Sequence, residues 1–287
     1  MSRATKASRV AILLMCAAVQ PLASQAARIR PIVADIASQR EQFLLNARIV
    51  ARKAIGEGIT HTSRITLTDG RITHDAHVQT IDIFKPIYRT KEGVEKNFHD
   101  SYKYNIAAYR VAKMLNMDMA PPCVYREVDG QPASVCWWVD DVQFDELTRR
   151  EKKVEPPDGE DWTRQLNLVR VFDQLIDNTD RNQGNLLIDR DWKLWMIDHS
   201  RAFRVTTVLR RPEVLRRVSQ QMLEGMRAMT LTQCMSELRP YLTEDEIRSM
   251  MVRRDLLLKF FADAVSEKGA DAVFTDLPRK TPNVTIP

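Results

Sequence analysis

The chain has 287 residues, of which 44% are hydrophobic and 28% are charged. This length and composition can bury a full core, so we expect one bilobed domain and exclude a disordered chain. The formal net charge is +5, but Arg3, Lys6 and Arg9 lie in residues 1–26, which contain no acidic residue, so +2 remains for the rest. A charge this small does not indicate nucleic acid as a partner.

The first 26 residues have the pattern of an export signal. A positively charged start precedes an apolar run at 10–19, and small residues end the segment at Ala26. The apolar run is too short to span a bilayer. We therefore expect a cleaved signal and a periplasmic or secreted protein. The alternatives are an uncleaved anchor or a misplaced start codon, and the latter would leave the protein in the cytoplasm.

Three cysteines lie outside this segment, at Cys123, Cys136 and Cys234, apart from Cys16 within it. An odd and scattered set predicts neither a disulfide framework nor a metal-ligand spacing. Cys136 lies in an apolar strand-like stretch, so we expect it to be a buried thiol of the core.

The first part of the chain predicts a helical lead-in followed by short strands. Residues 27–45 have a helical pattern without a chemical motif, and Asp69-Gly70 predicts a hairpin turn. Gly56 and Gly58 form either a phosphate-covering loop, because glycine lets backbone N–H groups approach phosphates, or an ordinary turn. The strand-like runs are at 47–51, 63–67, 78–83 and 82–86.

A helix and a second hairpin follow. Residues 100–115 have the periodicity of an amphipathic helix, and Asp129-Gly130 predicts the turn before a strand at 133–139. Trp137 and Trp138 are neighbours on that strand and must point to opposite faces, so at most one lines a pocket. Packing of both in the core is the alternative. The charged residues that follow, at 149–161, predict a solvated loop.

The chemistry of the chain is concentrated in residues 171–203. An apolar helical stripe ends in the polar run D-N-T-D-R-N-Q-G-N, and two apolar strands follow. The second strand ends at Asp198. This order of helix, loop and hairpin is expected to bring Asp180, Asn185 and Asp198 together.

Phosphoryl transfer requires a residue that orients the attacking hydroxyl and oxygen ligands for a Mg²⁺ ion that bridges phosphates. Kinase-type sites place an Asp first, an Asn four or five residues later, and a metal-binding Asp after the next hairpin. Here Asn185 follows Asp180 by five residues, and Asp198 follows by thirteen more. A polar turn that caps a helix is the alternative, but the length of the pattern favours a kinase-type site.

This segment resembles the catalytic and metal-binding loops of atypical kinases of the phosphatidylinositol 3- and 4-kinase group, especially the type II phosphatidylinositol 4-kinases. It is also similar to the secretory-pathway kinases related to the Golgi casein kinase and, more distantly, to bacterial toxin kinases. The resemblance covers about 47–203 and implies an α+β, bilobed protein-kinase-like fold. A small antiparallel β N-lobe with the hinge would occupy 46–148, a mainly helical C-lobe 149–277, and an extended tail 278–287.

The resemblance also implies roles for single residues. Asp180 would be the catalytic Asp, and Asn185 and Asp198 would bind Mg²⁺ or Mn²⁺. Lys85 belongs to an F-K-P motif similar to that of the related kinases, and would contact the phosphates of ATP.

The adenine end of the nucleotide is expected at the hinge. Trp138 and Val139 would line the adenine pocket, and Gly56 and Gly58 would cover the phosphates.

One position departs from the related kinases. Their helix reads E-I-A-A-Y or E-I-A-A-F, and its Glu pairs with the strand Lys, whereas this chain has Asn105. Asn105 can accept a hydrogen bond from Lys85 but cannot neutralise it, and Glu95 and Asp100 are the alternative partners for that lysine. Besides an ATP-dependent kinase acting on a protein, lipid or small-molecule hydroxyl, a nucleotide-binding pseudokinase or scaffold and a nucleotidyl (AMP) transferase therefore stay open.

The remainder of the chain is expected to be helical. Residues 204–217 carry a basic run that could dock substrate or phosphate, or simply form a solvated helix face. Thr243 begins a capping box for a helix that runs to about Glu267 and ends before Gly269. The methionines of this region are expected to pack between helices.

Overall fold

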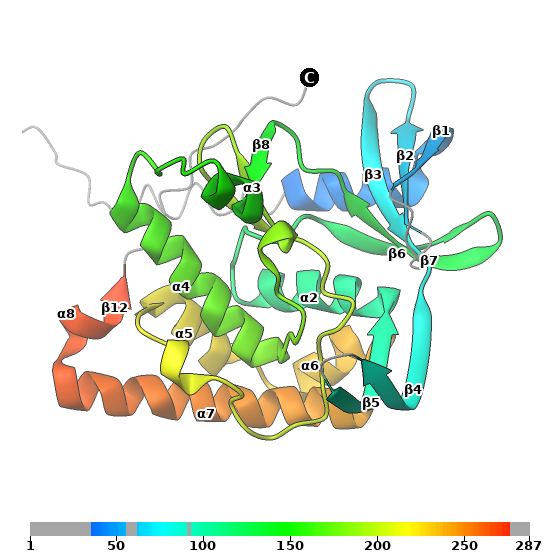
Figure 1. Ribbon diagram of the computed structural model, residues 1–287. Coiled ribbons are helices and arrows are strands. Elements are labelled where there is room, and N and C mark those ends of the chain that lie inside the picture. Colours follow the sequence, from blue (N-terminus) through cyan, green and yellow to red (C-terminus); the bar gives the residue numbers. More distant parts are fainter. Residues whose placement is uncertain (1–35, 56–61, 91–92, 276–287) are drawn as a thin grey trace, which may run out of the picture.

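The computed structural model describes residues 36–55, 62–90 and 93–275. The expected export signal, the two glycines of the proposed phosphate loop and the C-terminal tail lie outside these ranges. The described chain divides into a half built on a β-sheet and a helical half, with helix α2 (Tyr102–Met114) between them (Figure 1). No helix within the described ranges is long and apolar enough to span a bilayer.

A five-stranded antiparallel sheet with the order β1-β2-β3-β7-β6 forms the first half. Its strands are β1 (Arg48–Ala54), β2 (Ser63–Thr68), β3 (Thr73–Gln79), β6 (Cys123–Val128) and β7 (Gln131–Trp137). The predicted turns are confirmed: Gly70 joins β2 to β3 with φ +90°, and Asp129 and Gly130 join β6 to β7 with φ +54° and +75°. Two positive φ values in a row are typical of the type I′ turn, which suits the twist of paired strands.

The sheet has one apolar face and one polar face. Ile65, Val78 and Trp137 belong to the apolar face, which packs against the helical segment 36–46. Because side chains alternate along a strand, the register partners Arg64, His77 and Cys136 project from the other face. This second face is turned toward α2, because Gln79, two residues after His77, bonds to a side chain of that helix.

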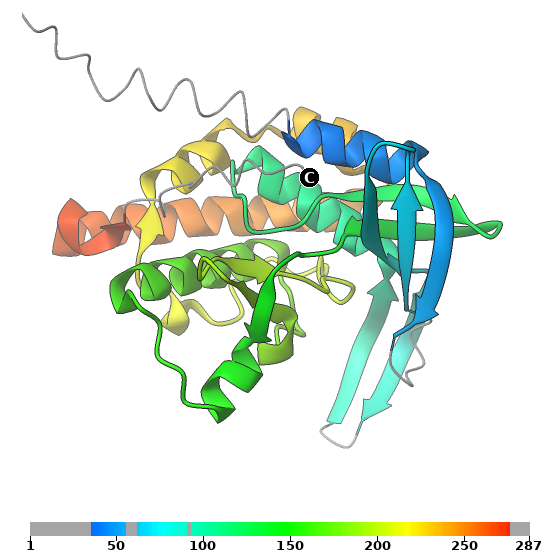
Figure 2. The same cartoon turned by 90° about the horizontal axis from the view of Figure 1, so that it is seen from above.

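The chain between the sheet and α2 forms a separate ribbon. The sequence predicted one strand at 78–83, and this is wrong, because β3 ends at Gln79 and a new strand begins at Asp82. Buried Ile81 marks the break, and its carbonyl accepts from Tyr102 N at the start of α2 (2.7 Å). The resulting ribbon of β4 (Asp82–Thr90) and β5 (Gly93–Ser101) projects from the body of the protein (Figure 2).

The chain joins the helical half soon after β7. Strand β8 (Val142–Asp145) pairs with a strand of the helical half, and helix α3 (Glu146–Glu151) follows it directly. The prediction of a solvated loop is therefore wrong for 149–151. The reason is that Asp145 caps α3, and buried Glu146 accepts hydrogen bonds from Arg149 Nε at 2.6 Å.

The helical half contains a three-stranded sheet, a two-stranded parallel pair and most of the helices. Its sheet has the order β10-β9-β8. Its elements are α4 (Gly159–Ile176), η1 (Gln183–Asn185), β9 (Leu186–Asp189), β10 (Leu194–Met196), η2 (Pro212–Val214), β11 (Val218–Ser219), α5 (Gln220–Ala228), α6 (Leu231–Leu238), α7 (Glu244–Lys268), α8 (Ala270–Val273) and β12 (Phe274–Thr275). The capping box at Thr243 and the end of α7 before Gly269 are confirmed, and buried methionines fill the spaces between helices.

The predicted helix at 204–217 is not formed. This segment is irregular apart from the single turn η2. Buried Arg253 on α7 donates to the carbonyl oxygens of Arg204 (2.9 Å) and Thr206 (2.5 Å), which therefore bond to a side chain and not to helical N–H groups. Branched side chains at 205–208 also disfavour a helix.

Two of the cysteines form a disulfide, which corrects the sequence prediction. Cys123 on β6 and Cys136 on β7 are register partners and are bonded to each other, so Cys136 is not a free thiol. Only Cys234 is free among the described cysteines, and it is buried. The cysteine spacing did not predict this pair. The two positions lie opposite each other because of the hairpin register, and their sequence separation of 13 residues gives no sign of it.

The disulfide makes a prediction about thiol content and stability. A chain that begins at residue 27 has three cysteines, and one of them should react when the protein is denatured without reductant, and all three after reduction. Replacing Cys123 and Cys136 together by Ala should lower the free energy of unfolding by about 2–3 kcal/mol, because a loop of this length is no longer closed in the unfolded chain. Thiol titration and urea unfolding measure the two effects. Three reactive thiols before reduction would contradict the pairing.

Candidate active site

The β9–β10 hairpin places two of the predicted site residues side by side. Leu186 and Met196 are register partners in this antiparallel pair. The adjoining residues are bonded as well, because Ile197 N donates to Asn185 O at 3.1 Å. Asp198 follows Ile197 and therefore lies beside the start of β9.

Arg181 connects this hairpin to the loop that follows α4. Its guanidinium forms an ion pair with Asp173 of α4 at 3.1 Å, and it donates to Asn185 O (3.1 Å) and Ile197 O (2.7 Å). Asn185 Nδ2 donates to Asp180 O at 3.2 Å. The guanidinium of Arg181, whose side chain is 11% exposed, thus links α4 to both strands of the hairpin.

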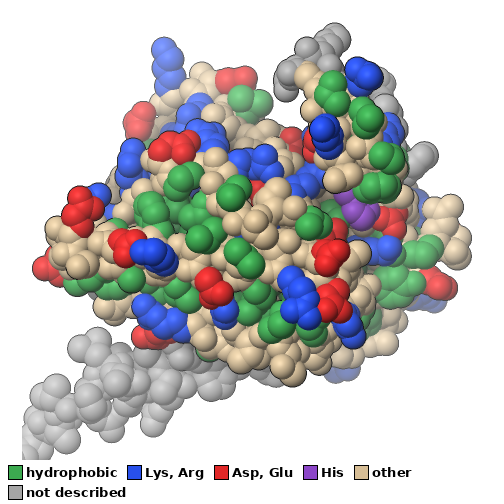
Figure 3. Space-filling view, turned by 90° about the horizontal axis from the view of Figure 1, so that it is seen from below, with side chains coloured by type: hydrophobic (Ala, Val, Ile, Leu, Met, Phe, Trp, Pro, Cys, Tyr) green, Lys and Arg blue, Asp and Glu red, His purple; other side chains and the backbone are tan. Residues whose placement is uncertain are grey.

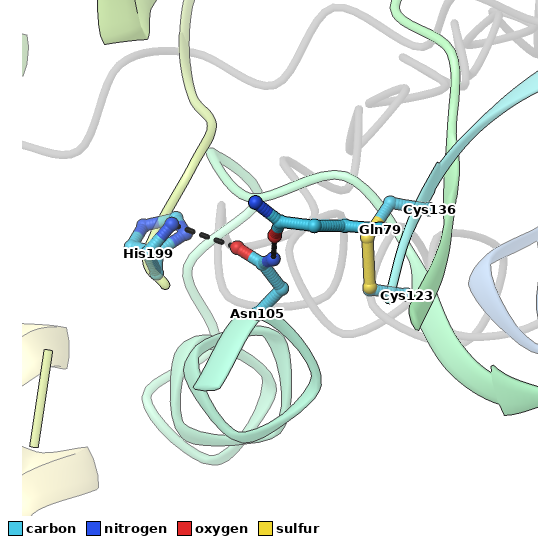
Figure 4. The surroundings of a disulfide bond; sticks show 5 residues. All are labelled: Gln79, Asn105, Cys123, Cys136 and His199. Atoms are coloured by element: carbon cyan, nitrogen blue, oxygen red, sulfur yellow. Dashed lines mark hydrogen bonds between the residues drawn. A yellow bond between two sulfur atoms is a disulfide. The ribbon is translucent and has the colours of Figure 1, made fainter. Parts of the chain in front are cut away.

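Asp198 is exposed and is held in a rarely populated backbone conformation. Its φ is +51°, which costs a non-glycine residue about 1 kcal/mol or more. The next N–H group, that of His199, donates to Asn105 Oδ1 at 2.7 Å, and Asn105 Nδ2 donates to Gln79 Oε1 at 2.6 Å (Figure 4). The buried amide of Asn105 therefore ties the residue after Asp198 to the end of strand β3.

Two histidines flank Asp198. Burial strongly lowers the pKa of His199, helped by the positive charge of Arg181, so this ring is neutral and packs edge-on against Phe172. Burial also lowers the pKa of His77 on the polar face of the sheet, against the opposing attraction of the Asp198 carboxylate. Asp198 consequently lies beneath the sheet.

Asp100 is a third carboxyl group at this point. Burial raises its pKa, and the negative charges of Asp198 and Asp180 raise it further, while a hydrogen bond from Ser200 and the charge of Arg201 oppose the shift. Asp198 and Asp180 thus both act on one carboxyl group. The structure therefore brings Asp180, Asn185 and Asp198 into one site and adds Asp100 at the end of β5.

A second ion-pair cluster covers Asp180. Arg201 Nη1 lies 3.3 Å from Asp180 Oδ2, and Arg201 Nη2 lies 3.0 Å from Glu95 Oε2. Arg204 forms an ion pair with the same glutamate at 2.5 Å. The guanidinium of Arg201 lies over the ring of Phe98, 4.9 Å from its centroid.

Lys85 does not join the carboxylates through any contact among the described residues. It lies on β4 of the projecting ribbon, is exposed, and places Nζ 4.6 Å above the ring of Tyr88. The ring of Tyr88 packs against that of Phe98, with centroids 4.3 Å apart and the planes tilted by 35°, and Phe98 in turn contacts Arg201. Lys85 is therefore near the edge of the Arg201 cluster, but it is not paired with Asn105, as the resemblance had suggested.

The two tryptophans at the end of β7 lie on opposite faces of the sheet. Trp137 is buried in the apolar core of the sheet and packs against Phe43. Trp138 is half-buried and lies under the guanidinium of Arg64 (4.2 Å), a residue of the polar face. Trp138 is thus the tryptophan that can line a pocket, and buried Val139 follows it.

Across the described ranges, no three histidine, cysteine or carboxylate side chains form a group that could hold a metal ion by themselves. The available donors are carboxylates and one amide, which suit Mg²⁺ or Mn²⁺ when substrate phosphates and water complete the coordination shell. Burial raises the pKa of Asp100, and the nearby charges of Asp198 and Asp180 raise it further. The donor set and its charge therefore fit a divalent cation.

Comparison with known proteins shows what the whole fold is. No protein-family model matches the sequence, and no curated protein matches it. Among solved structures, the Fam20 protein of hydra with sugar has a TM-score of 0.58 at 14% identity, covering 82% of this chain and 90% of that chain. The Golgi casein kinase with Mn and ADP bound has a TM-score of 0.58 at 13% identity, covering 86% and 81%.

The chain has a protein-kinase-like fold. The expectation of an α+β chain with an antiparallel sheet and a helical lobe is confirmed. A weaker likeness, with a TM-score of 0.46 at 11% identity over 75% of this chain and 92% of that chain, relates it to the Helicobacter pylori proinflammatory kinase CtkA. We call the sheet half the N-lobe and the helical half the C-lobe.

The fold explains what is unusual at Asn105. Protein kinases join the third strand of the N-lobe to the helix beneath it by an ion pair between a Lys and a Glu. Here the third strand, β3, contains no lysine, and its contact with α2 is the hydrogen bond between Gln79 and Asn105. The described contact between β3 and α2 is therefore made by a neutral amide pair.

The sequence did not predict that Gln79, Arg201 and Asp100 belong to this site. Gln79 gave no signal, because a glutamine at a strand end is common. Arg201 follows the Asp198-His199-Ser200 triplet, and its spacing from Asp198 was the only available clue. Asp100 had been considered only as a replacement for the helix glutamate.

Replacing Asn105 tests the amide bridge. Asn105→Leu should leave the buried N–H of His199 without an acceptor and lower the free energy of unfolding by about 1–3 kcal/mol. Hydrogen exchange at the His199 amide should accelerate. Gln79→Met is the matched control, since it breaks the bond to the strand and keeps the bond to His199. Equal exchange rates at His199 in the two variants would contradict the bridge.

Replacing Asp100 tests the shared negative charge. Because the folded state raises the pKa of Asp100 above its ordinary value of 3.8, the folded protein binds this proton more tightly than the unfolded chain. The contribution of Asp100 to stability therefore falls as pH rises from about 4 through the raised pKa. Asp100→Asn should melt at a higher temperature than the wild type at pH 7 without metal, and the difference should shrink toward pH 4. The exposed Asp263→Asn should show no such trend. A lower melting temperature for Asp100→Asn at pH 7 would refute the account.

Proposed function

We propose that this chain is an ATP-dependent phosphotransferase that moves the γ-phosphate to a hydroxyl group of a protein, lipid or small molecule. The observation that supports this most directly is the convergence of Asp180, Asn185 and Asp198 beneath the polar face of the N-lobe sheet. A kinase-like fold with this triad of side chains has the parts that phosphoryl transfer requires.

Asp180 would orient the acceptor hydroxyl and accept its proton. Its carboxylate is 42% exposed, so an acceptor can reach it. Asn185 Oδ1 and Asp198 would hold Mg²⁺ or Mn²⁺, and Asp100 would add a third ligand. The cation would neutralise charge on the phosphate oxygens during transfer.

The nucleotide would lie under the N-lobe sheet. Trp138 and Val139 follow β7 where the chain leaves the N-lobe, the place at which kinase folds bind adenine. Lys85 remains a proposed phosphate ligand, which would require its side chain to leave the ring of Tyr88. Gly56 and Gly58 remain proposed as a phosphate-covering loop.

We infer that the protein acts outside the cytoplasm. The disulfide between Cys123 and Cys136 supports this, because disulfides persist in oxidising compartments. The pattern of residues 1–26 supports export as well. A periplasmic or secreted enzyme would then need ATP from another source, such as a host compartment. Membership of the phosphatidylinositol 3-/4-kinase-like group rests on the motif at 171–203 alone.

Two alternatives use the same site. The neutral pair of Gln79 and Asn105 favours a nucleotide-binding pseudokinase, because no lysine is held at the phosphates by that contact. Nucleotidyl transfer is possible if ATP binds in the reverse direction, so that its α-phosphate lies at Asp198. A pure scaffold has no physical need for the grouped carboxylates.

Intact-mass measurement after incubation with ATP and Mg²⁺ or Mn²⁺, with and without candidate acceptors, separates these functions. We expect a phosphate increment on the protein or on an acceptor. Asp198→Ala and Asp180→Asn should each lower the rate by at least about 100-fold, because each removes a group that acts on the reacting atoms. Asp263→Asn, an exposed residue of α7, is the control.

Other outcomes would identify a different function for the site or none. An AMP increment would identify nucleotidyl transfer in place of kinase activity. No increment, together with nucleotide binding that Asp198→Ala abolishes, would identify a pseudokinase. No binding of nucleotide by the wild type would reject all enzyme functions proposed for this site.

A further inference from the structure

Kinase folds pair a strand lysine with the helix beneath the N-lobe sheet, but in the described part of this chain neither β3 nor β4 has a lysine bonded to α2. Phosphoryl transfer still needs positive charge at the phosphates beyond that of the metal ion. The contact of β3 with α2 is made by Gln79 and Asn105, which carry no charge. If the proposed function is correct and Lys85 stays over the ring of Tyr88, another cation of the chain must supply this charge.

Arg201 is the cation placed closest to the group that would orient the acceptor. Its guanidinium lies 3.3 Å from Asp180 and 3.0 Å from Glu95, and its side chain is 26% exposed. Its Nε is buried and has no hydrogen-bond partner among the described residues. The space-filling view from below shows a hollow between two projecting parts of the molecule, and Lys and Arg side chains line part of it (Figure 3).

The other cations near the site are engaged elsewhere. Arg64 is bonded to Asp75 at 2.6 Å and covers Trp138, Arg181 is bound to Asp173 and to backbone carbonyls, and Lys85 lies on the exposed ribbon.

The surroundings of Arg201 hold its guanidinium plane in position. Phe98 provides a flat surface on one side of the group. Glu95 holds Nη2 and is itself also paired with Arg204. The contact with Asp180 is the longer and more exposed of the two ion pairs of Arg201, so it is the one that a phosphate can replace.

We propose that Arg201 binds the γ-phosphate of ATP and takes the place of the strand lysine. A guanidinium matches a phosphate with two parallel N–H donors, which an ammonium group cannot do. Before nucleotide binds, Arg201 is paired with Asp180. When the γ-phosphate binds Arg201, Asp180 is released to accept a proton.

In the proposed transfer, one bond forms and one bond breaks at the γ-phosphorus. The acceptor oxygen forms a bond to the γ-phosphorus, the bond between that phosphorus and the β–γ bridging oxygen breaks, and ADP leaves with the bond's electron pair. The acceptor's proton passes to Asp180 and then to solvent. Arg201 neutralises the negative charge on the equatorial oxygens of the phosphoryl group during its transfer.

Comparison of ATP and ADP binding tests this role. The probes are ADP and the β,γ-imido analogue of ATP, each with Mn²⁺, measured by calorimetry. Because Arg201 contacts only the γ-phosphate, Arg201→Met should weaken binding of the ATP analogue at least about 10-fold and change ADP binding less than about 2-fold. Arg201→Lys should restore part of the affinity for the analogue. Arg248→Met, an exposed pair member on α7, is the control.

Lys85→Met gives the competing result. If Lys85 is the phosphate cation, that variant should weaken both nucleotides, and Arg201→Met should weaken neither. An equal loss of both nucleotides in Arg201→Met, or no loss of either, would overturn the proposal. Wild-type protein that binds neither nucleotide would reject the proposed function itself. Melting temperature of each variant establishes that it is folded.

Discussion

The site depends on the guanidinium of Arg181, which is largely shielded from solvent. Three segments meet there: helix α4 through Asp173, the start of β9 through Asn185 O, and the end of β10 through Ile197 O. The cation donates to two backbone carbonyls of the hairpin, and Asp173 balances its charge. Together with the bond from Asn185 Nδ2 to Asp180 O, it fixes the segments that carry Asp180, Asn185 and Asp198, none of which is part of a long regular element.

Charge is distributed unevenly between the two lobes at the cleft. The C-lobe and the base of the ribbon supply three carboxyl groups, at Asp180, Asp198 and Asp100. On the N-lobe side, His77 and Gln79 carry no charge, because burial lowers the pKa of His77 and the side chain of Gln79 is an amide. The excess negative charge suits a divalent cation, and the cations that balance it come from the segment after Asp198.

The fold was largely predictable where local patterns are strong. Asp-Gly turns, the capping box at Thr243 and the alternating hairpin at 186–197 each follow from chemistry within a few residues. The predictions failed where distant groups decide. Carbonyls of 204–206 bond to Arg253 on α7, so no helix forms there, and the pairing of Cys123 with Cys136 depends on hairpin register.

The same distinction applies to the site. The sequence alone determined the order and spacing of Asp180, Asn185 and Asp198, because a helix, a loop and a tight hairpin leave little freedom in how these residues meet. Only the tertiary structure decided the partners of Asn105 and the position of Arg201 against Glu95. Those contacts join residues 26 to 106 positions apart, and such distances are fixed by the packing of β3, β5 and α2 against the C-lobe, which no local pattern encodes.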